Sequence, residues 1–306
     1  MGKTAVVTAG TGGIGLETAL GLAAAGFAVT VVGRDAERGA RAVDLLNTAN
    51  PRRPGRFLSA DLASLDEVRA LAGRIASDHT APGEGLTVLV NNVGAMFPHR
   101  RHRDGIEESF LVNHLSPYLL TELLLPSLTA GAPSRIVNVT SAAVGVAKRA
   151  FDAVEPPGGY YGFHWYGRAK LANLAYTLDL AERLDGAGVQ VFAADPGGAA
   201  TDMTDGTLRD PRIVAPALRL LWPLVRRKFE RSTSGPASAA ARPSIAAATD
   251  EGLAGRTGVV IGARAHPVPP FRPATDRRLA QAVRRLSERH APLTVRGQNH
   301  SDEPSG

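Results

Sequence analysis

Tyr166 and Lys170 are the pair of residues whose types and spacing most directly suggest chemistry. On a helix, side chains four residues apart lie on one face, so the phenol and the ammonium would be neighbours. A nearby positive charge favours the phenolate form of a tyrosine, whose pKa is ordinarily about 10. A tyrosine tuned in this way can exchange a proton with a substrate oxygen near neutral pH. The same spacing also occurs in ordinary surface pairs, so the rest of the chain must decide between the two interpretations.

A glycine-rich segment near the N-terminus is typical of a phosphate-binding loop. It follows an apolar β-branched run at Thr4–Ala9 and opens directly into an expected helix. Glycines let the backbone approach a pyrophosphate closely, and the helix N-terminus offers free N–H groups at the positive end of its dipole. We therefore predict a dinucleotide site. Its loop residues are Gly10, Thr11, Gly12, Gly13, Ile14 and Gly15.

The end of the second expected strand favours NADP(H) over NAD(H). An NAD-selective fold places a carboxylate there for the ribose 2′-hydroxyl, but this chain has Gly33 followed by Arg34. An arginine suits the 2′-phosphate of NADP because its planar fork pairs well with phosphate oxygens. Asp35 weakens this argument, and Arg38 is either a second phosphate partner or a surface residue.

Short apolar runs alternate with amphipathic helical stretches along most of the chain. The expected strands are Thr4–Ala9, Ala28–Gly33, Gly55–Ala60, Leu86–Asn91, Arg135–Thr140, Val189–Ala194 and Thr257–Ile261. The expected helices include Ile14–Ala25, Ala36–Ala49, Leu65–Ser77, Ile106–Leu128 and Trp165–Leu184. This alternation predicts an α/β fold, a single doubly wound Rossmann-type domain with about seven parallel strands flanked by helices.

We assign this single domain to residues 1–293 and a flexible tail to 294–306. Two stretches break the alternation of strands and helices. One is an irregular insertion at 147–163, and the other is an apolar segment at 203–235 with the size of a substrate lid.

The order of these motifs makes the chain resemble a short-chain dehydrogenase/reductase. Besides the glycine loop and the Tyr166/Lys170 pair, the matching positions are Asp61-Leu62, Asn91-Asn92-Val93-Gly94, Asn113, Thr140-Ser141 and Pro196-Gly197 through Thr201. The sequences around Asn113 and Lys170 further resemble the retinol-dehydrogenase-like branch. The chain departs from the family pattern at Ala9, where a glycine is usual, and at Val93, where an alanine is usual. If position 9 needs a positive φ, either Ala9 is strained or the turn shifts by one residue.

The resemblance implies a catalytic role for four residues. Tyr166 would be the general acid in reduction and the base in oxidation, with Lys170 lowering its pKa and holding the nicotinamide ribose. Ser141 would bind and polarise the substrate oxygen. Asn113 would anchor a water that links Lys170 to solvent. Taken singly, Asn113 could instead be a polar helix residue and Ser141 a strand-end cap.

The resemblance also implies further cofactor contacts. Asp61 would meet the adenine amino group, although it could instead be the N-cap of the following helix. Asn91 would meet the cofactor-side backbone, and Thr201 would bind the carboxamide. The remaining expected cofactor residues are Leu62, Val93, Gly94, Pro196 and Gly197.

Aromatic residues are concentrated next to the expected catalytic helix. Six of the chain's aromatic residues lie at 151–166, namely Phe151, Tyr160, Tyr161, Phe163, Trp165 and Tyr166. An aromatic wall suits a flat or lipophilic ligand, although the rings could equally pack the insertion onto the domain. The predicted substrate contacts are Ser141, Tyr160, Tyr161, Phe163, Trp165 and, in the lid, Trp222.

These features favour an NADP(H)-dependent oxidoreductase, a ketoreductase or alcohol dehydrogenase. It would act on a bulky hydrophobic or polycyclic ketone or alcohol, for example in tailoring an aromatic natural product. One alternative is an epimerase or dehydratase of the same fold that recycles its cofactor. The other is a non-catalytic NADP-sensing protein.

Composition argues against several other classes. The 306 residues contain no cysteine, which excludes disulfides, thiolate metal sites and cysteine nucleophiles. The net charge of +6 comes from arginines spread along the chain, so we expect no nucleic-acid partner. No apolar run is long enough for a membrane helix, and we expect a cytoplasmic protein with no bound metal. The loop His99–Arg103 is either solvated or in contact with an anionic substrate. By family analogy, the helices at 106–128 and 165–184 would form the contacts of a homo-dimer or homo-tetramer.

Overall fold

The computed structural model describes residues 2–78, 85–197, 213–219, 224, 227 and 235–294. Thr201, Trp222 and most of the 203–235 segment expected to form a lid lie outside these residues, as does the tail from residue 295.

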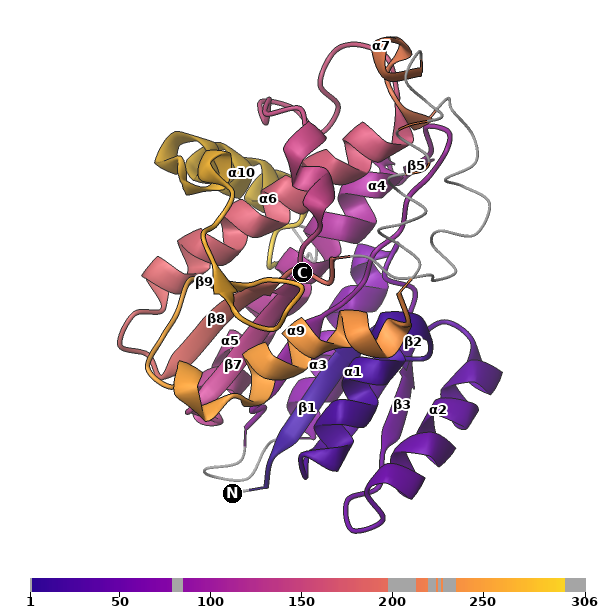
Figure 1. Ribbon diagram of the computed structural model, residues 1–306, viewed down its shortest axis with the longest axis vertical. Coiled ribbons are helices and arrows are strands. Elements are labelled where there is room, and N and C mark those ends of the chain that lie inside the picture. Colours follow the sequence, from indigo (N-terminus) through magenta and orange to yellow (C-terminus); the bar gives the residue numbers. More distant parts are fainter. Residues whose placement is uncertain are drawn as a thin grey trace, which may run out of the picture.

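An eight-stranded sheet forms the centre of the molecule (Figure 1). Its strands, in spatial order, are β10 (Pro267–Val268), β9 (Val259–Ile261), β8 (Val189–Ala194), β7 (Ser134–Val139), β4 (Val88–Asn91), β1 (Thr4–Thr8), β2 (Ala28–Gly33) and β3 (Arg56–Ser59). All neighbouring pairs are parallel except β9 and β10. The predicted doubly wound sheet is confirmed. The antiparallel edge strand was not predicted, because two residues are too short to show any periodicity.

Helices cover both faces of the sheet. The helices of one face are α1 (Gly13–Ala24), α2 (Ala36–Ala49) and α9 (Ala237–Thr249), and those of the other are α3 (Leu65–Ser77), α5 (Ser116–Ala130) and α6 (Gly162–Arg183). Successive residues of β1 point to opposite faces, so Val7 packs into the first layer and Val6 into the second. Because both faces are covered, the strands are apolar throughout, which is the pattern that revealed them in the sequence.

The helix expected at 106–128 is interrupted. A small hairpin of β5 (His102–Arg103) and β6 (Ile106–Glu107) precedes α4 (Glu108–Phe110), a π-helical turn at Leu111–Leu115 and then α5. The Glu107 carboxylate caps α4 by accepting hydrogen bonds from the N–H groups of Ser109 and Phe110, both at 2.8 Å. In the wide turn, the Asn113 side chain donates to the Ser109 carbonyl at 2.8 Å. Such turns are rare and often mark functional sites.

Helix α6 is buried within its own chain. Every residue from Trp165 to Thr177 is buried, because α6 packs between the sheet, the insertion and α10 (Arg277–His290), which runs along its outer side (Figure 1). His114 in the π-helical turn hydrogen-bonds to Ser287 of α10 at 2.7 Å and fixes this arrangement. A subunit contact through α6, as family analogy suggested, would therefore require α10 to move. Among the described residues, no helix is both long enough and apolar enough to cross a bilayer.

Candidate active site

The predicted catalytic pair, Tyr166 and Lys170, lies on α6 beneath the carboxyl ends of the central strands. Lys170 is buried, and its ammonium donates hydrogen bonds to the carbonyl oxygens of Val93 and Val139, both at 2.9 Å. The Val93 carbonyl lies just after the end of β4, and the Val139 carbonyl belongs to the last residue of β7. Lys170 therefore links the ends of these two strands. Its Nζ lies 5.8 Å from the centroid of the Tyr166 ring, which confirms that the two side chains share one helix face.

Ser141 is brought next to Tyr166 by close packing of α6 on the short helix after β7. Its hydroxyl accepts the Ala143 N–H at 3.2 Å and also hydrogen-bonds to the Tyr166 phenol, which favours a lower pKa for Tyr166. Gly167 makes the approach possible, because a Cβ there would overlap the Ala143 carbonyl oxygen. Gly167 was not predicted from the sequence. The available signal was a glycine in a helix interior, directly after the candidate tyrosine.

The pKa values differ from the expectation that Lys170 acidifies Tyr166. Burial raises the pKa of Tyr166 to about 12, and the hydrogen bond from Ser141 offsets this only in part. Burial also lowers the pKa of Lys170 to about 7, because its charge is removed from water. The Lys170 ammonium points at two carbonyls and is not among the groups that shift the Tyr166 pKa. Protein groups alone therefore keep the phenol protonated at neutral pH.

Asn113 holds the loop that carries one of the Lys170 acceptors. Its side-chain amide donates to the Ala95 carbonyl at 2.8 Å, and its amide oxygen accepts the Ala95 N–H at 2.9 Å. This pair of hydrogen bonds pins the loop after β4, in which the Val93 carbonyl binds Lys170. The role of Asn113 as a water anchor stays a prediction.

The glycine loop adopts a turn with Ala9 in the left-handed region. Ala9 has a φ of 49°, and Gly10 is not among the residues with positive φ, so the turn has not shifted by one residue. Gly12 is the N-cap of α1 and makes no side-chain cap. Among the described residues, the N–H groups of Gly13 and Ile14 therefore have no capping side chain, as a phosphate-binding helix end requires.

Replacing Ala9 by glycine should stabilise the protein. A left-handed backbone costs an L-residue about 1–2 kcal/mol, and glycine avoids this cost. The greater conformational freedom of glycine in the unfolded chain cancels part of that stabilisation. We expect the free energy of unfolding in urea to rise by roughly 0.5–1 kcal/mol. Ala40→Gly on the exposed side of α2 is the control and should lose about 1 kcal/mol. A lower free energy of unfolding in Ala9→Gly would contradict the inference that the backbone of Ala9 is strained.

The two asparagines after β4 point in different directions, and contact of Asn91 with a cofactor stays a prediction. The Asn91 side chain points into the core, where its amide donates to Thr121 Oγ1 and Asn138 Oδ1, both at 2.8 Å. The neighbouring Asn92 instead reaches the glycine loop and donates to the carbonyls of Thr8 at 3.2 Å and Ala9 at 3.4 Å. The sequence showed the Asn-Asn pair but not which side chain faces the loop, because consecutive residues at a strand end point to opposite sides.

Two arginines lie at the expected adenosine end of the site. Arg34 is exposed, and the Arg38 guanidinium lies directly beside Gly12. Asp35 caps α2 by accepting the Arg38 N–H at 2.9 Å, and this bond lowers the pKa of Asp35. Asp35 is thus accounted for as a helix cap. The uncapped α1 end, the cradle around Gly15 and the two guanidinium groups together fit a phosphorylated dinucleotide.

Asp61 is already paired on the sheet edge. Its Oδ1 accepts the Ala63 N–H at 3.0 Å, and its Oδ2 lies 3.3 Å from Arg103. Ser64, not Asp61, is the N-cap of α3, so the alternative role for Asp61 is wrong. Leu62 is buried beside it.

The turn after β8 completes the described part of this edge. There, the N–H of Gly197, which follows Pro196, donates to Asp195 at 3.0 Å. Contacts of Asp61, Leu62, Val93, Gly94, Pro196 and Gly197 with a cofactor stay predictions.

The aromatic cluster has a structural part and an open part. Tyr160 donates its hydroxyl to the Phe97 carbonyl at 3.0 Å and packs its ring 5.0 Å from that of buried Trp165. Phe151 is buried against Phe110. The rings of Tyr160, Trp165 and Phe151 pack the insertion onto the domain, although Tyr160 is partly exposed, as are Tyr161 and Phe163. Their contact with a substrate stays a prediction.

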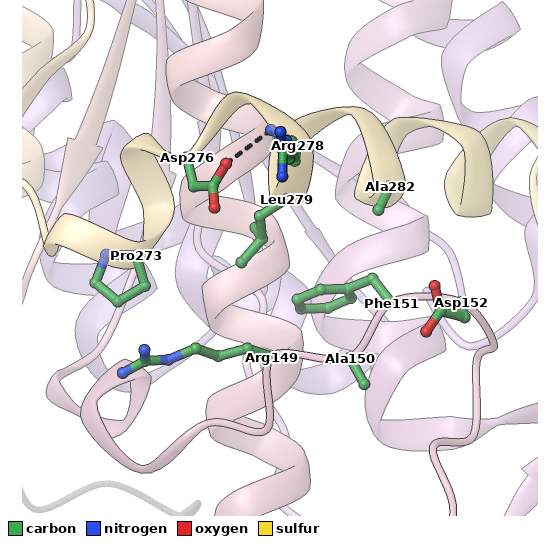
Figure 2. Close-up of a pocket in the computed structure, with 9 residues that line it drawn as sticks. All are labelled: Arg149, Ala150, Phe151, Asp152, Pro273, Asp276, Arg278, Leu279 and Ala282. Atoms are coloured by element: carbon green, nitrogen blue, oxygen red, sulfur yellow. Dashed lines mark hydrogen bonds between the residues drawn. The ribbon is translucent and has the colours of Figure 1, made fainter.

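The loop His99–Arg103 is tied to its surroundings by ion pairs. Arg100 lies 3.3 Å from Glu155, His102 pairs with the same carboxylate, and Arg103 pairs with Asp61. Within the described part of the chain, no cluster of side chains has the composition of a metal site. An open pocket of about 320 Å³ lies at the start of the insertion, between Arg149–Asp152 and the start of α10 (Figure 2). None of the four predicted catalytic residues lines it.

Glu107 is a buried carboxylate that no motif in the sequence indicates. Burial raises its pKa from 4.5 to about 7, despite its two backbone hydrogen bonds and the nearby Arg168. The folded protein therefore retains a proton that the unfolded chain releases. The stability that Glu107 contributes is complete below pH 4.5 and is lost as the pH rises through about 7.

We expect Glu107→Gln to gain stability relative to the wild type as the pH rises from 4.5 to about 7. The gain should be about 3 kcal/mol, because each pKa unit is worth about 1.4 kcal/mol. Urea unfolding at several pH values measures this difference. Glu108→Gln, which changes the neighbouring and more exposed carboxylate, is the control. A Glu107→Gln difference that is independent of pH would contradict the assignment.

Comparison with known proteins places this site in a family. The profile of the short chain dehydrogenase family matches residues 3–212. Retinol dehydrogenase 12 of Mus musculus is 35% identical over 76% of this chain and 71% of its own length. Dehydrogenase/reductase SDR family member 13 of Bos taurus is 36% identical over 99% of this chain and 76% of its own length.

A solved structure agrees with these sequence relatives. A short chain dehydrogenase from Burkholderia cenocepacia in complex with NADP has 26% identity and a TM-score of 0.66, covering 87% of this chain and 98% of that one. The chain therefore belongs to the short-chain dehydrogenase/reductase family, a class of oxidoreductases acting on alcohols and carbonyls. Within that family it is a member of the retinol-dehydrogenase-like branch.

Proposed function

We propose that this protein is an NADP(H)-dependent reductase of bulky hydrophobic ketones or aldehydes, with Tyr166 as the proton donor. The observation that carries the proposal is the grouping of Ser141, Tyr166 and Lys170 at the carboxyl ends of β4 and β7. Ligands of open α/β sheets bind at this edge.

The residues around the glycine loop support NADP(H). The N–H groups at the start of α1 would hold the pyrophosphate, and Arg34 and Arg38 would bind the 2′-phosphate. Gly33 offers no carboxylate to repel that phosphate, and the side chain of Thr11 packs against Gly33. The solved relative from Burkholderia cenocepacia is an NADP complex, which agrees with this choice. When bound, the dinucleotide supplies the hydride.

The protein's own groups would handle the proton. Ser141 donates a hydrogen bond to the substrate carbonyl oxygen and orients it toward Tyr166. Tyr166 then gives its phenolic proton to the developing alkoxide. Burial keeps Tyr166 protonated at neutral pH before the reaction, as a proton donor must be. Lys170 fixes the strand ends on either side of the tyrosine and supplies positive charge when protonated.

The proposed substrate class rests on the insertion and on the relatives. Tyr161 and Phe163 are partly exposed on the segment that joins Ser141 to Tyr166. Several curated relatives are named for retinol, a long apolar alcohol. Flat or elongated apolar substrates therefore fit better than sugars.

Oxidation of NADPH at 340 nm tests the proposal directly. The panel would contain retinal, a polycyclic aromatic ketone, a short aliphatic ketone and a ketose. We expect kcat/KM for retinal or the polycyclic ketone to exceed that for the sugar by at least about a hundredfold, as burial of a large apolar group predicts. A preference for the sugar, or no net oxidation with any compound, would reject it.

Changing Arg38 or Arg34 to alanine should reduce the preference for NADPH. Removing either guanidinium from the 2′-phosphate should raise the KM for NADPH about tenfold or more, while the KM for NADH stays nearly constant. Arg41→Ala is the matched control, because Arg41 is an exposed arginine on the same helix and lies 3.8 Å from Glu37. Equal effects on both cofactors would count against a 2′-phosphate site at these arginines.

A further inference from the structure

Arg168 is a buried cation that the catalytic scheme leaves unexplained. It lies on α6 between Tyr166 and Lys170, and its side chain is 1% exposed. Charged side chains are almost never buried to this extent unless all their donors are satisfied. The partners of Arg168 therefore indicate what it does.

The guanidinium group of Arg168 binds one short stretch of the insertion. Its Nε and Nη2 donate to the Ala150 carbonyl at 3.0 and 2.8 Å, Nη2 also donates to Ala153 at 2.6 Å, and Nη1 donates to Val154 at 2.7 Å. This stretch forms no helix or strand, so its carbonyls have no ladder of their own. Arg168 supplies the hydrogen-bond donors that a helix or strand would otherwise provide.

Two aromatic rings enclose the same guanidinium. The Arg168 Cζ lies 4.8 Å from the Phe110 ring centroid and 4.7 Å from that of Phe151. Phe151 belongs to the insertion, and its other side faces α10, where Figure 2 shows Leu279 and Ala282 above the ring. The insertion is thus held from the catalytic helix on its inner side and lies against the C-terminal helix on its outer side.

The charge of Arg168 is also balanced locally. Buried Glu107, when it is ionised, is the acidic group that most strongly favours the charged form of Arg168, and Asp152 contributes less. Farther along the insertion, Glu155 pairs with Arg100 and His102 of the loop after β4. The insertion is therefore fixed at two successive points before it reaches Tyr160 and Tyr161.

We propose that Arg168 is a positioning residue that fixes residues 150–154 to the catalytic helix and thereby sets the shape of the substrate side of the site. Only the planar fork of an arginine can bind three carbonyls while stacking between two rings. The link to substrate rests on the proposed function, in which the segment between Ser141 and Tyr166 borders the bound carbonyl compound. The anchoring of the segment does not depend on it.

Limited trypsin digestion tests the anchoring without any enzyme assay. Trypsin would cut the peptide bond between Arg149 and Ala150. The carbonyl of Ala150 accepts hydrogen bonds from Arg168, so this bond lies in the anchored stretch. In Arg168→Met, we expect this cleavage to be at least about tenfold faster, because removing a charged hydrogen bond shifts local opening by about that factor. Arg168→Lys should fall between the wild type and Arg168→Met. The control is Arg183→Met, which removes the ion pair to Glu122 at 2.7 Å in the last turn of the same helix and should cleave like the wild type.

Steady-state kinetics test the consequence for substrate. In Arg168→Met, we expect the KM for the best ketone or aldehyde to rise about tenfold, with partial rescue in Arg168→Lys. The value of kcat should change by less than about threefold, and so should the Kd of NADPH, measured by its fluorescence. Tyr166 and Lys170 keep their own partners in this variant.

Several outcomes would overturn the proposal. One is a rate of cleavage after Arg149 and a KM that are both unchanged in Arg168→Met. Another is a parallel loss of kcat and NADPH affinity, which would indicate a distorted helix. Should Arg168→Met not fold, Arg168→Lys and Phe151→Leu decide the same question, since each loosens the contact without removing the buried charge. If the wild type reduces no compound of the panel, the proposed function fails, while faster trypsin cleavage in the variants still supports the anchoring.

Discussion

Tyr166→Phe should abolish turnover and leave cofactor binding intact. The change removes one buried hydroxyl, which is hydrogen-bonded to Ser141, and keeps the ring that packs against the site. Loss of a general acid typically costs about 10²–10⁴ in rate, so we expect kcat for NADPH oxidation to fall about a thousandfold. The Kd of NADPH should stay within about threefold, because the phenol proton acts in the transition state and not in cofactor binding.

A second tyrosine of the same helix provides the control for that experiment. Tyr176 is also buried on α6, and its hydroxyl donates to Glu122 at 3.1 Å. Tyr176→Phe should cost about 1 kcal/mol of stability through the missing hydrogen bond and retain wild-type turnover. If Tyr166→Phe kept substantial activity, Tyr166 would not be the proton donor, and a role in cofactor sensing would gain weight.

Gly15→Ala should disrupt the glycine loop and cofactor binding together. A Cβ at this position would lie 2.5 Å from Asn92 Nδ2 and would overlap the Ala9 carbonyl group. The obstacle includes backbone of the strained turn, which cannot rotate away as a flexible side chain would. We expect the free energy of unfolding to fall by about 3 kcal/mol and the affinity for NADPH to fall at least about tenfold.

Gly73→Ala is the matched control for Gly15→Ala. Gly73 lies on α3, and a Cβ there would meet nothing within 4 Å. The substitution should stabilise the protein by about 1 kcal/mol, because alanine has the higher helix propensity. Urea unfolding and NADPH fluorescence titration measure both variants. Normal stability and affinity in Gly15→Ala would show that the loop does not have the described close contact with Asn92.

Local patterns in the sequence were sufficient for the scaffold of the site. The predicted α2 and α3 begin and end where the structure has them, and β2 and β8 agree as well. These elements have clear apolar periodicity, and α2 and α3 also have a capping residue in front of their first turn, Asp35 and Ser64. The helix predicted at 106–128 was wrong in its first part. Its apolar run concealed both the cap at Glu107 and the π-helical turn around Asn113.

Contacts between distant parts of the chain decided the chemistry of the site. The pKa of Tyr166 rises because strands, loops and α6 together remove it from water, and no window of sequence around residue 166 contains that information. The same is true of Arg168, which resembles a surface arginine until the insertion folds onto it. The covering of α6 by α10 joins residues more than a hundred positions apart, as in the ion pair between Asp179 and Arg284.

The sequence by itself determined the order of strands and helices, the glycine loop and the shared helix face of Tyr166 and Lys170. Each depends on residues within a few positions of one another, where helix and strand periodicity act. Only the tertiary structure decided that Asn92, not Asn91, supports the loop, that Lys170 binds two strand ends, and that Arg168 holds the insertion. Burial and hydrogen-bond partners are properties of the packed chain, because they depend on which distant segments come together around each side chain.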